Sequence, residues 1–168
     1  SSPQAITTQA VEQFELIQAS GSLVSVTQSS IPGDTGWYDS GTQVEAVYDY
    51  SWDASDHARS NAVAYSIDGS ESRLDRVGSG TFTVSLKMDG PHTISIRSVM
   101  QYSLTISGGD DIAVTPSSPT GDGFFDSGMN IRVSTANTWN VVGGSSRENL
   151  ASYTLDGATV GIARAEAG

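Results

Sequence analysis

Residues 121–157 read GDGFFDSGMNIRVSTANTWNVVGGSSRENLASYTLDG, and residues 33–69 read GDTGWYDSGTQVEAVYDYSWDASDHARSNAVAYSIDG. The later stretch repeats the pattern of the earlier one at an offset of 87 residues, which becomes 88 after one inserted residue. The residues that align include Trp37 with Phe124, Asp39 with Asp126, Val44 with Ile131, Trp52 with Trp139, Arg59 with Arg147 and Tyr65 with Tyr153. A period of this length is typical of a small β-domain and exceeds the unit of a solenoid. The sequence therefore predicts two domains in tandem.

The second copy is expected to be incomplete. The first copy continues after Gly80 into TFTVSLKMDGPHTISIRS, residues 81–98, which predicts an antiparallel hairpin around Asp-Gly-Pro. The second copy stops at Gly168, which matches Gly80, so this hairpin has no counterpart. A sandwich without its last two strands would expose an apolar cleft and two backbone edges, which folded proteins cover. We therefore expect a segment from outside the second copy to fill the gap.

Composition and charge restrict the class of protein. The 168 residues include 18 glycines and many serines and threonines between short apolar alternations, which is typical of all-β domains with many turns. There is no cysteine, so neither disulfides nor thiolate metal sites are expected. The formal net charge of −11 opposes nucleic acid and anionic membrane surfaces as partners, because both attract basic patches. No apolar run approaches the roughly 20 residues that cross a bilayer, so no membrane insertion is expected.

The predicted fold class is all-β, with two tandem immunoglobulin-like β-sandwiches. The expected parts are an N-terminal tail over residues 1–21, a complete sandwich over residues 22–102 and an incomplete sandwich over residues 103–168. Apolar and polar residues alternate over residues 43–52 and again over residues 80–88, which predicts strands with one buried face. The segment DASDHARSN, residues 53–61, is predicted to be a polar loop.

Several phrases of the sequence resemble the tandem immunoglobulin-like repeats of archaeal cell-surface and secreted proteins. They are GWYDSG at residues 36–41, MDGPHTI at residues 88–94 and QYSLTI at residues 101–106. The resemblance covers residues 22–168 and implies an extracellular structural protein whose signal peptide has been removed. Such modules serve surface layers, stalks, adhesins and filaments alike, so the resemblance alone does not select one of these roles.

The tail carries the side-chain pattern of a strand that could fill the gap. The expected donor side chains, which share one face of such a strand, are Ile6, Thr8, Ala10, Phe14 and Leu16. A helix that places Ala10, Val11, Phe14 and Ile17 on one side is the alternative. The expected acceptor groove of the second sandwich is lined by Ile131, Val133, Leu150, Tyr153, Leu155, Val160 and Ile162.

These patterns predict an extracellular filament built from identical subunits by donor-strand complementation, in which the tail of one subunit completes the second sandwich of the next. Phe14 and Leu16 are the expected anchors. Because such a contact joins different surfaces of the two copies, it extends head to tail into an open fibre. The alternatives are a fragment of a longer surface-layer protein, a second sandwich completed by its own tail, and a carbohydrate-binding or adhesin module.

No catalytic site is expected. His57 lies in sequence near Asp53 and Asp56, but a hydrolase also needs an oriented nucleophile and an oxyanion site, and the second copy has no histidine at the matching position. His92 follows Pro91 in the predicted hairpin turn and is expected to be structural. We therefore expect a protein that is not an enzyme.

Two kinds of ligand site remain open. Asp110, Asp111 and Asp122 could supply oxygen ligands to Ca²⁺, although none belongs to an EF-hand pattern, and no other cofactor is expected. Four aromatic residues in glycine-flanked loops could stack on sugar rings, as in carbohydrate-binding modules. They are Trp37, Tyr38, Phe124 and Phe125.

Overall fold

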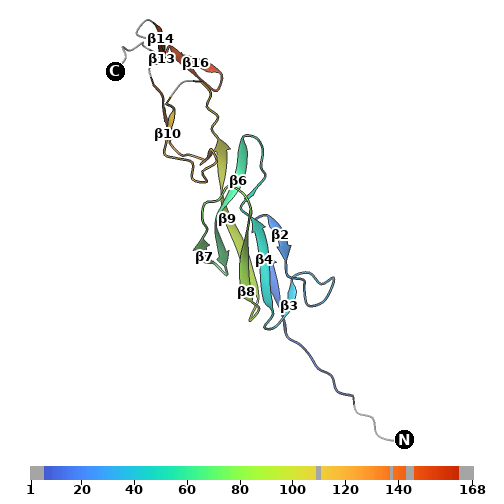
Figure 1. Ribbon diagram of the computed structural model, residues 1–168. Coiled ribbons are helices and arrows are strands. Elements are labelled where there is room, and N and C mark those ends of the chain that lie inside the picture. Colours follow the sequence, from blue (N-terminus) through green and yellow to red (C-terminus); the bar gives the residue numbers. More distant parts are fainter. Residues whose placement is uncertain (1–5, 109–110, 137, 143–145, 163–168) are drawn as a thin grey trace, which may run out of the picture.

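Short apolar alternations separated by glycine-rich turns fold into a molecule made of strands, as the sequence predicts. The computed structural model describes residues 6–108, 111–136, 138–142 and 146–162. Within these ranges the chain forms sixteen strands and no helix, so none of the described segments is a helix that could cross a membrane. The molecule is elongated, with the N-terminal segment at one end and the second repeat at the other (Figure 1).

The first repeat folds into two sheets. The smaller sheet has the order β2-β4-β8, with β2 at Leu23–Val26, β4 at Gln43–Asp49 and β8 at Thr81–Lys87. The larger sheet has the order β3-β1-β9-β6-β5, and β7 adds to β6. Its strands are β1 (Gln13–Gln18), β3 (Trp37–Asp39), β5 (Ser51–Trp52), β6 (Ala58–Ile67), β7 (Ser70–Arg73) and β9 (His92–Ser103).

The two sheets enclose a common hydrophobic core, which makes the first repeat a sandwich. On β8 the apolar side chains at alternate positions are buried and the polar ones between them are exposed, as the alternation predicts. The buried cluster draws on both sheets and consists of Leu16, Tyr38, Val44, Ala46, Tyr48, Ala62, Phe82, Val84, Leu86, Met88, Ile94 and Ile96. This core gives the first repeat the support that a small domain requires.

β1 belongs to the first sandwich, although residues 1–21 are predicted to form a separate tail. It pairs antiparallel with β3 and parallel with β9. Leu16 is only 5% exposed and lies in the core, and Phe14 packs against it. Of the described part of the predicted tail, only residues 6–12 precede this strand.

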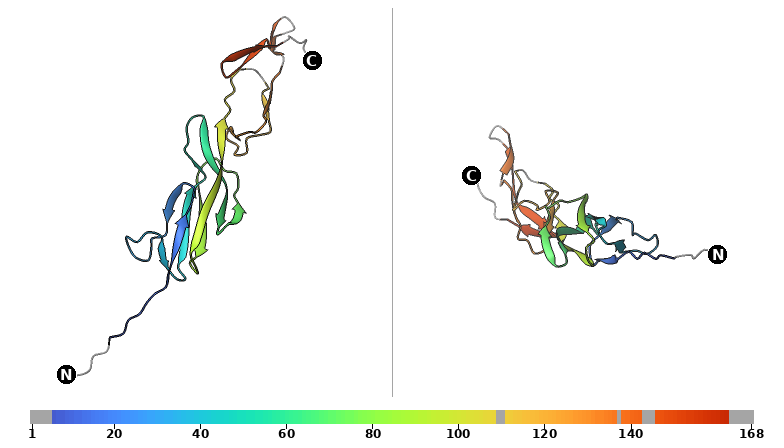
Figure 2. Two further views of the ribbon diagram at one scale, coloured as in Figure 1. Left: turned by 180° about the vertical axis from the view of Figure 1, so that it is seen from behind. Right: turned by 90° about the horizontal axis from the view of Figure 1, so that it is seen from below.

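The second repeat contains shorter strands in separate pairs. β10 (Ala113–Thr115) pairs with β12 (Arg132–Ser134), β13 (Thr138–Val142) with β14 (Ser146–Asn149), and β15 (Ser152–Leu155) with β16 (Ala158–Gly161). β11 (Phe124–Asp126) instead pairs with the C-terminal end of β9. The last strand of the first repeat therefore extends to the second repeat and forms hydrogen bonds with it (Figure 2).

Each pairing of the second repeat copies one of the first, residue by residue. The matches are β11–β9 with β3–β1, β10–β12 with β2–β4, β13–β14 with β5–β6, and β15–β16 with β6–β7. For example, Tyr153 opposes Val160 where Tyr65 opposes Ser72. Three pairings of the first repeat have no counterpart among the described residues of the second, and all three involve β8 or β9.

Candidate functional site

Apolar side chains lie exposed along the strands of the second repeat. Val133, Tyr153, Leu155 and Val160 are between 40% and 60% exposed. Ile131, Leu150 and Ile162 are half-buried. Together these are the seven predicted acceptor residues, and none of them is fully buried.

The matching residues of the first repeat are mostly buried in its core. Val44, Ala46 and Ala62 are fully buried at the positions of Ile131, Val133 and Leu150. Those that match Tyr153, Leu155 and Ile162 pack against the core and are Tyr65, Ile67 and Leu74. Val160 is the exception, because it matches the exposed Ser72. Six of the seven predicted acceptor residues therefore stand at positions that, in the first repeat, are buried in the core or packed against it.

The N-terminal segment has the sequence of a β9 strand. Residues 3–12 read PQAITTQAVE and align at an offset of 88 with residues 91–100, PHTISIRSVM. The alignment continues into β1, where the pattern Gln-aromatic-x-Leu begins at residues 13 and 101. The repeat therefore extends into the predicted tail. Residues 6–12 form no strand, are exposed, and point away from the second repeat in both views of Figure 2.

This alignment revises the set of donor side chains. Ile6 and Thr8 match Ile94 and Ile96, which are buried in the first repeat, whereas Ala10 matches the exposed Ser98. Val11, which the alternation did not select, matches the half-buried Val99 because the β6–β9 pairing shifts its register just before that point. The signal that identifies Val11 is the offset of 88 residues, not the two-residue period.

Phe14 and Leu16 are not available as donor anchors in this structure. Both lie in β1 and pack in the sandwich of their own chain. Their withdrawal would open the first repeat, because β1 bridges β3 and β9. The donor positions are thus confined to the segment before β1.

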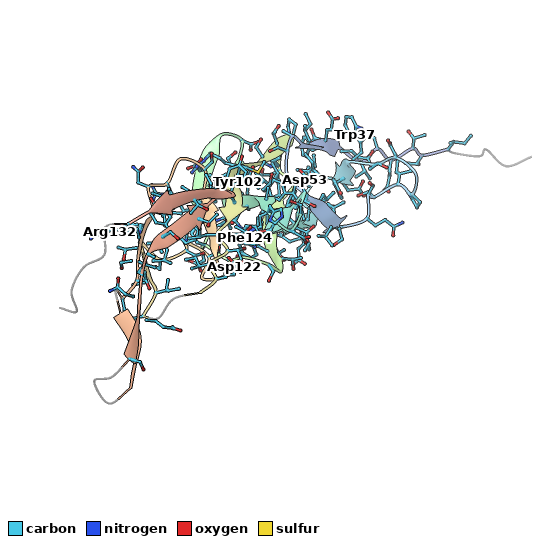
Figure 3. The ribbon with its side chains drawn as sticks, turned by 90° about the horizontal axis from the view of Figure 1, so that it is seen from above. Trp37, Asp53, Tyr102, Asp122, Phe124 and Arg132 are labelled. Atoms are coloured by element: carbon cyan, nitrogen blue, oxygen red, sulfur yellow. The ribbon has the colours of Figure 1, made fainter. Side chains whose placement is uncertain are left out.

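Arg59 of the first repeat binds residues of the second repeat. It is 7% exposed, and its Nε atom donates to Oε1 of Gln101 at 2.9 Å. Its Nη1 atom lies 2.8 Å from Oδ2 of Asp122, and its guanidinium carbon lies 4.0 Å from the ring centroid of Phe124. Asp122 and Phe124 both lie where the two repeats meet (Figure 3). A cation held between a carboxylate and an aromatic face is well stabilised there.

A second arginine pairs across the same junction. Arg76 binds Asp126 through two hydrogen bonds of 2.9 and 2.6 Å, and Nε2 of Gln101 donates to Oδ1 of Asp126 at 2.9 Å. The hydrogen bond from Arg76 holds the pKa of Asp126 below its ordinary value. Burial raises the pKa of Asp122, but hydrogen bonds from Arg59 and Thr120 outweigh it and leave that pKa low as well. Both carboxylates are therefore ionised partners at neutral pH.

The N-terminal end of the first repeat has the same backbone and amide arrangement without the arginines. Nε2 of Gln13 donates to Oδ1 of Asp39 at 2.7 Å, as Gln101 does to Asp126. The amide of Ser40 donates to the carbonyl of Glu12 at 2.8 Å, and the matching bond from Ser127 to Met100 is also 2.8 Å. At the position of Phe124 stands Trp37, which is 38% exposed. We call the surface formed by Gln13, Asp34, Trp37 and Asp39 the N-terminal pole.

The four aromatic residues considered for sugar stacking have different surroundings. Tyr38 and Phe125 are buried, and the Tyr38 hydroxyl donates to the carbonyl of Thr27 at 2.8 Å, so neither can present a ring face to a sugar. The guanidinium of Arg59 lies over the Phe124 ring. Trp37 alone among the four keeps an accessible ring.

The two aspartates considered for Ca²⁺ that the structure describes have different surroundings. Asp122 is committed to Arg59 and Thr120, Asp111 lies exposed in a turn, and Asp110 is outside the described residues. Within the described ranges no three histidine, cysteine or acidic side chains come together as a metal site. Asp68 and Asp89 instead bind the ring of His92, at 2.6 and 3.1 Å, and so brace a hairpin turn.

A cavity of about 430 Å³ lies beside the junction and contains Arg73, Arg76 and Arg97 in its wall. Arg76 is paired with Asp126, and Arg97 is paired with Glu71 through two hydrogen bonds. These pairings satisfy two of its three cations within the chain, so the cavity does not form a concentrated anion site.

Comparison with known proteins adds no relative. No protein-family model matches the sequence, and no curated protein or solved structure is significantly similar to the chain.

Proposed function

We propose that the chain is the structural subunit of an extracellular filament, in which each subunit is two immunoglobulin-like sandwiches in tandem. Residues 4–12 of one subunit take, in the second repeat of the next, the place that β9 takes in the first repeat. Subunits then join head to tail, and the partner of each subunit is another copy of the same chain.

The observation that supports this proposal is a match between the two ends of the molecule. One end carries a segment with the sequence of β9 and no partner strand among the described residues. The other end carries β14 and β15, which are the counterparts of β6, and residues 104–106, which match the part of β1 that pairs with β9. Ile106, Tyr153 and Leu155 are exposed there. The two lie far from each other along the elongated molecule (Figure 1), which favours joining between copies over closure within one.

The register follows from the first repeat. Ile94 opposes Ile67 on β6 and Gln18 on β1, so Ile6 would oppose Leu155 on one side and Ile106 on the other. A strand inserted between two edges makes backbone hydrogen bonds on both. Burying Ile6 and Val11 would add about 1.5–3 kcal/mol for each side chain before the ordering of the segment is subtracted.

The proposal is confined to the β9 position. No segment of the printed sequence matches β8 in the second repeat, so the outer edge of β12 is not assigned a partner. The formal net charge of −11 is compatible with the exterior of a cell and does not by itself select it.

A longer array of the same repeat is the second candidate, and one observation favours it. Residues 3–12 have the sequence of the last strand of a preceding repeat, as would be found at any internal boundary of such an array. In that case the chain would remain monomeric when isolated, because its neighbours would be covalent.

Electron microscopy and light scattering of the purified chain test the proposal. We expect fibres from the intact chain and monomers from a variant lacking residues 1–12, which retains β1. Ile6→Asp should act like the deletion, while Ile31→Asp, at an exposed loop position of the first repeat, serves as the control. Circular dichroism checks that all variants keep the sandwich. Fibres from the deletion variant, or an intact chain that stays monomeric at every concentration tested, would refute strand donation.

A further inference from the structure

We propose that the N-terminal pole is a docking surface for an arginine of the second repeat of another copy, and that the contact reproduces the junction between the two repeats of one chain. This inference rests on the proposed function and adds a second contact to it, beside the inserted strand. The arginine that the pole would receive is Arg147, which stands at the position of Arg59.

The amide of Gln13 is already oriented to receive a donor. At the inner junction, Gln101 gives its Nε2 hydrogen to Asp126 and accepts from Arg59 on Oε1. At the pole, Nε2 of Gln13 donates to Asp39 in the same way. This leaves Oε1 of Gln13 without a partner among the residues that the structure describes. The equivalent atom at the inner junction, Oε1 of Gln101, accepts the hydrogen bond from Arg59. Asp39 therefore fixes which end of the amide an arriving guanidinium meets.

Two further residues that contact Arg59 have counterparts at the pole, although Thr120, which accepts a hydrogen bond from Arg59, is replaced by Pro32. Trp37 matches Phe124 and offers a larger ring face, on which a guanidinium stacks at least as well. Asp34 matches Asp122, since residues 26–34 align with residues 114–122 before a one-residue gap at Thr35. Asp34 is exposed and forms no ion pair within the described part of the chain. The pole thus carries an amide oxygen, an aromatic ring and, in the neighbouring loop, a carboxylate at the sequence positions of the groups that surround Arg59 at the inner junction.

The strands that bring the arginine to this position are the same at both junctions. Arg59 lies in β6 opposite Gln101 of β9, and Arg147 lies in β14, whose pairing with β13 copies β5–β6. If residues 4–12 insert as β9 does, residue 13 follows directly and comes to lie opposite residue 147. The side chain of Arg147 is outside the described residues, so its match with Arg59 is one of sequence.

The arginine contact would fix the register of the inserted strand and the angle between the two subunits, which the strand alone does not fix. An inserted strand can slip by two residues and still bury one face, whereas a bound arginine at its end fits one register. The arginine contact also fixes the angle between successive subunits, because the inner junction fixes the angle between repeats. Each boundary between successive repeats along a fibre would then have the same geometry, whether the two repeats belong to one subunit or to two.

A charge exchange tests the docking surface. We expect Asp34→Arg and Arg147→Asp each to raise the critical concentration for fibre formation by about tenfold or more, through repulsion between like charges. The double variant, in which the charges are exchanged, should recover most of the loss. Glu45→Arg, which makes the same change of charge at an exposed position on β4, is the control and should leave the critical concentration for fibre formation nearly unchanged.

Insertion of the strand can be measured separately from the arginine contact. The chain has no cysteine, so a single pair of introduced cysteines, Thr7→Cys on one copy and Thr154→Cys on another, reports insertion of the strand by forming a disulfide. If the disulfide forms and the charge exchange changes nothing, or the double variant is as poor as the singles, the docking surface is wrong and strand donation stands. If neither the disulfide nor a fibre forms, both proposals fail together.

Discussion

Ile6 and Ile94 occupy the same position of the repeat in opposite environments: 94% of Ile6 is exposed, and Ile94 is fully buried between β1 and β6. The same residue type is thus placed once in a completed sheet and once on an unpaired segment. The difference lies in the neighbours, because Ile94 has a partner strand on each side and residues 6–12 have none among the described residues.

The first prediction concerns the register of the inserted strand. Ser95 opposes Ser66 in the first repeat, so Thr7 should oppose Thr154 of another copy. A mixture of Thr7→Cys and Thr154→Cys chains should give a disulfide-linked dimer on a non-reducing gel, since opposed residues of antiparallel strands are within bonding reach. Thr8→Cys in place of Thr7→Cys points to the other face and should give little product. Equal yields from both would mean that the register is not the one derived from β9.

The second prediction concerns Arg59. Replacement by Gln removes the ion pair with Asp122 and the stacking on Phe124, and leaves buried acceptors such as Oε1 of Gln101 poorly satisfied. We expect the free energy of unfolding to fall by about 2–4 kcal/mol, measured by urea denaturation. Arg97→Gln is the matched control, because the pair of Arg97 with Glu71 is exposed to solvent, so its loss should change the urea midpoint little. Similar losses in both variants would contradict the role given to Arg59.

The third prediction concerns acid. The hydrogen bond from Arg76 lowers the pKa of Asp126 in the folded protein, so the pair stabilises the fold above the ordinary carboxyl range and loses its effect as the pH falls below about 4. Asp126→Asn should therefore lower stability at pH 7 and flatten the decline of stability between about pH 5 and pH 2. Urea midpoints measured across this range check both effects. Asp75→Asn, an exposed change, is the control and should leave the urea midpoint at pH 7 nearly unchanged.

The fourth prediction concerns Asn61, which is fully buried on β6. Its Nδ2 atom donates to the carbonyls of Tyr50 and Val77 at 3.2 and 2.7 Å and so ties β6 to the segment after β7. Asn61→Ala should cost about 1–3 kcal/mol, because the carbonyl of Val77 loses the donor that Asn61 provides and that of Tyr50 keeps only the bond from the amide of Ala62. Asn130→Ala, at an exposed position, should change the urea midpoint little. An unchanged midpoint for Asn61→Ala would show that water replaces the amide.

The repeat made much of this fold predictable. Alternation alone identified the buried face of β8, and the alignment of the two copies selected acceptor positions whose equivalents in the first repeat line its core. These features are local, or follow from copying a local pattern, so one sequence is enough to show them.

Two features were missed for physical reasons. β1 pairs with β9 across some 75 residues of chain, and alternation does not specify such a long-range partner, so residues 13–18 were assigned to a free tail. The segment around Arg59 and Asn61 was predicted to be a polar loop because its residues are polar. It is part of β6, and these two side chains are buried because each has several hydrogen-bond partners.

β9 runs without interruption from the sheet of the first repeat to its pairing with β11 of the second. A load applied along the long axis would therefore pass through one covalent backbone between the repeats, and the ladders beside it would be loaded in shear, with many bonds resisting at once. Ladders that are pulled at one end open one bond at a time instead. The continuity of this strand makes the boundary between repeats a site that resists stretching, a property that a flexible linker at the same place could not provide.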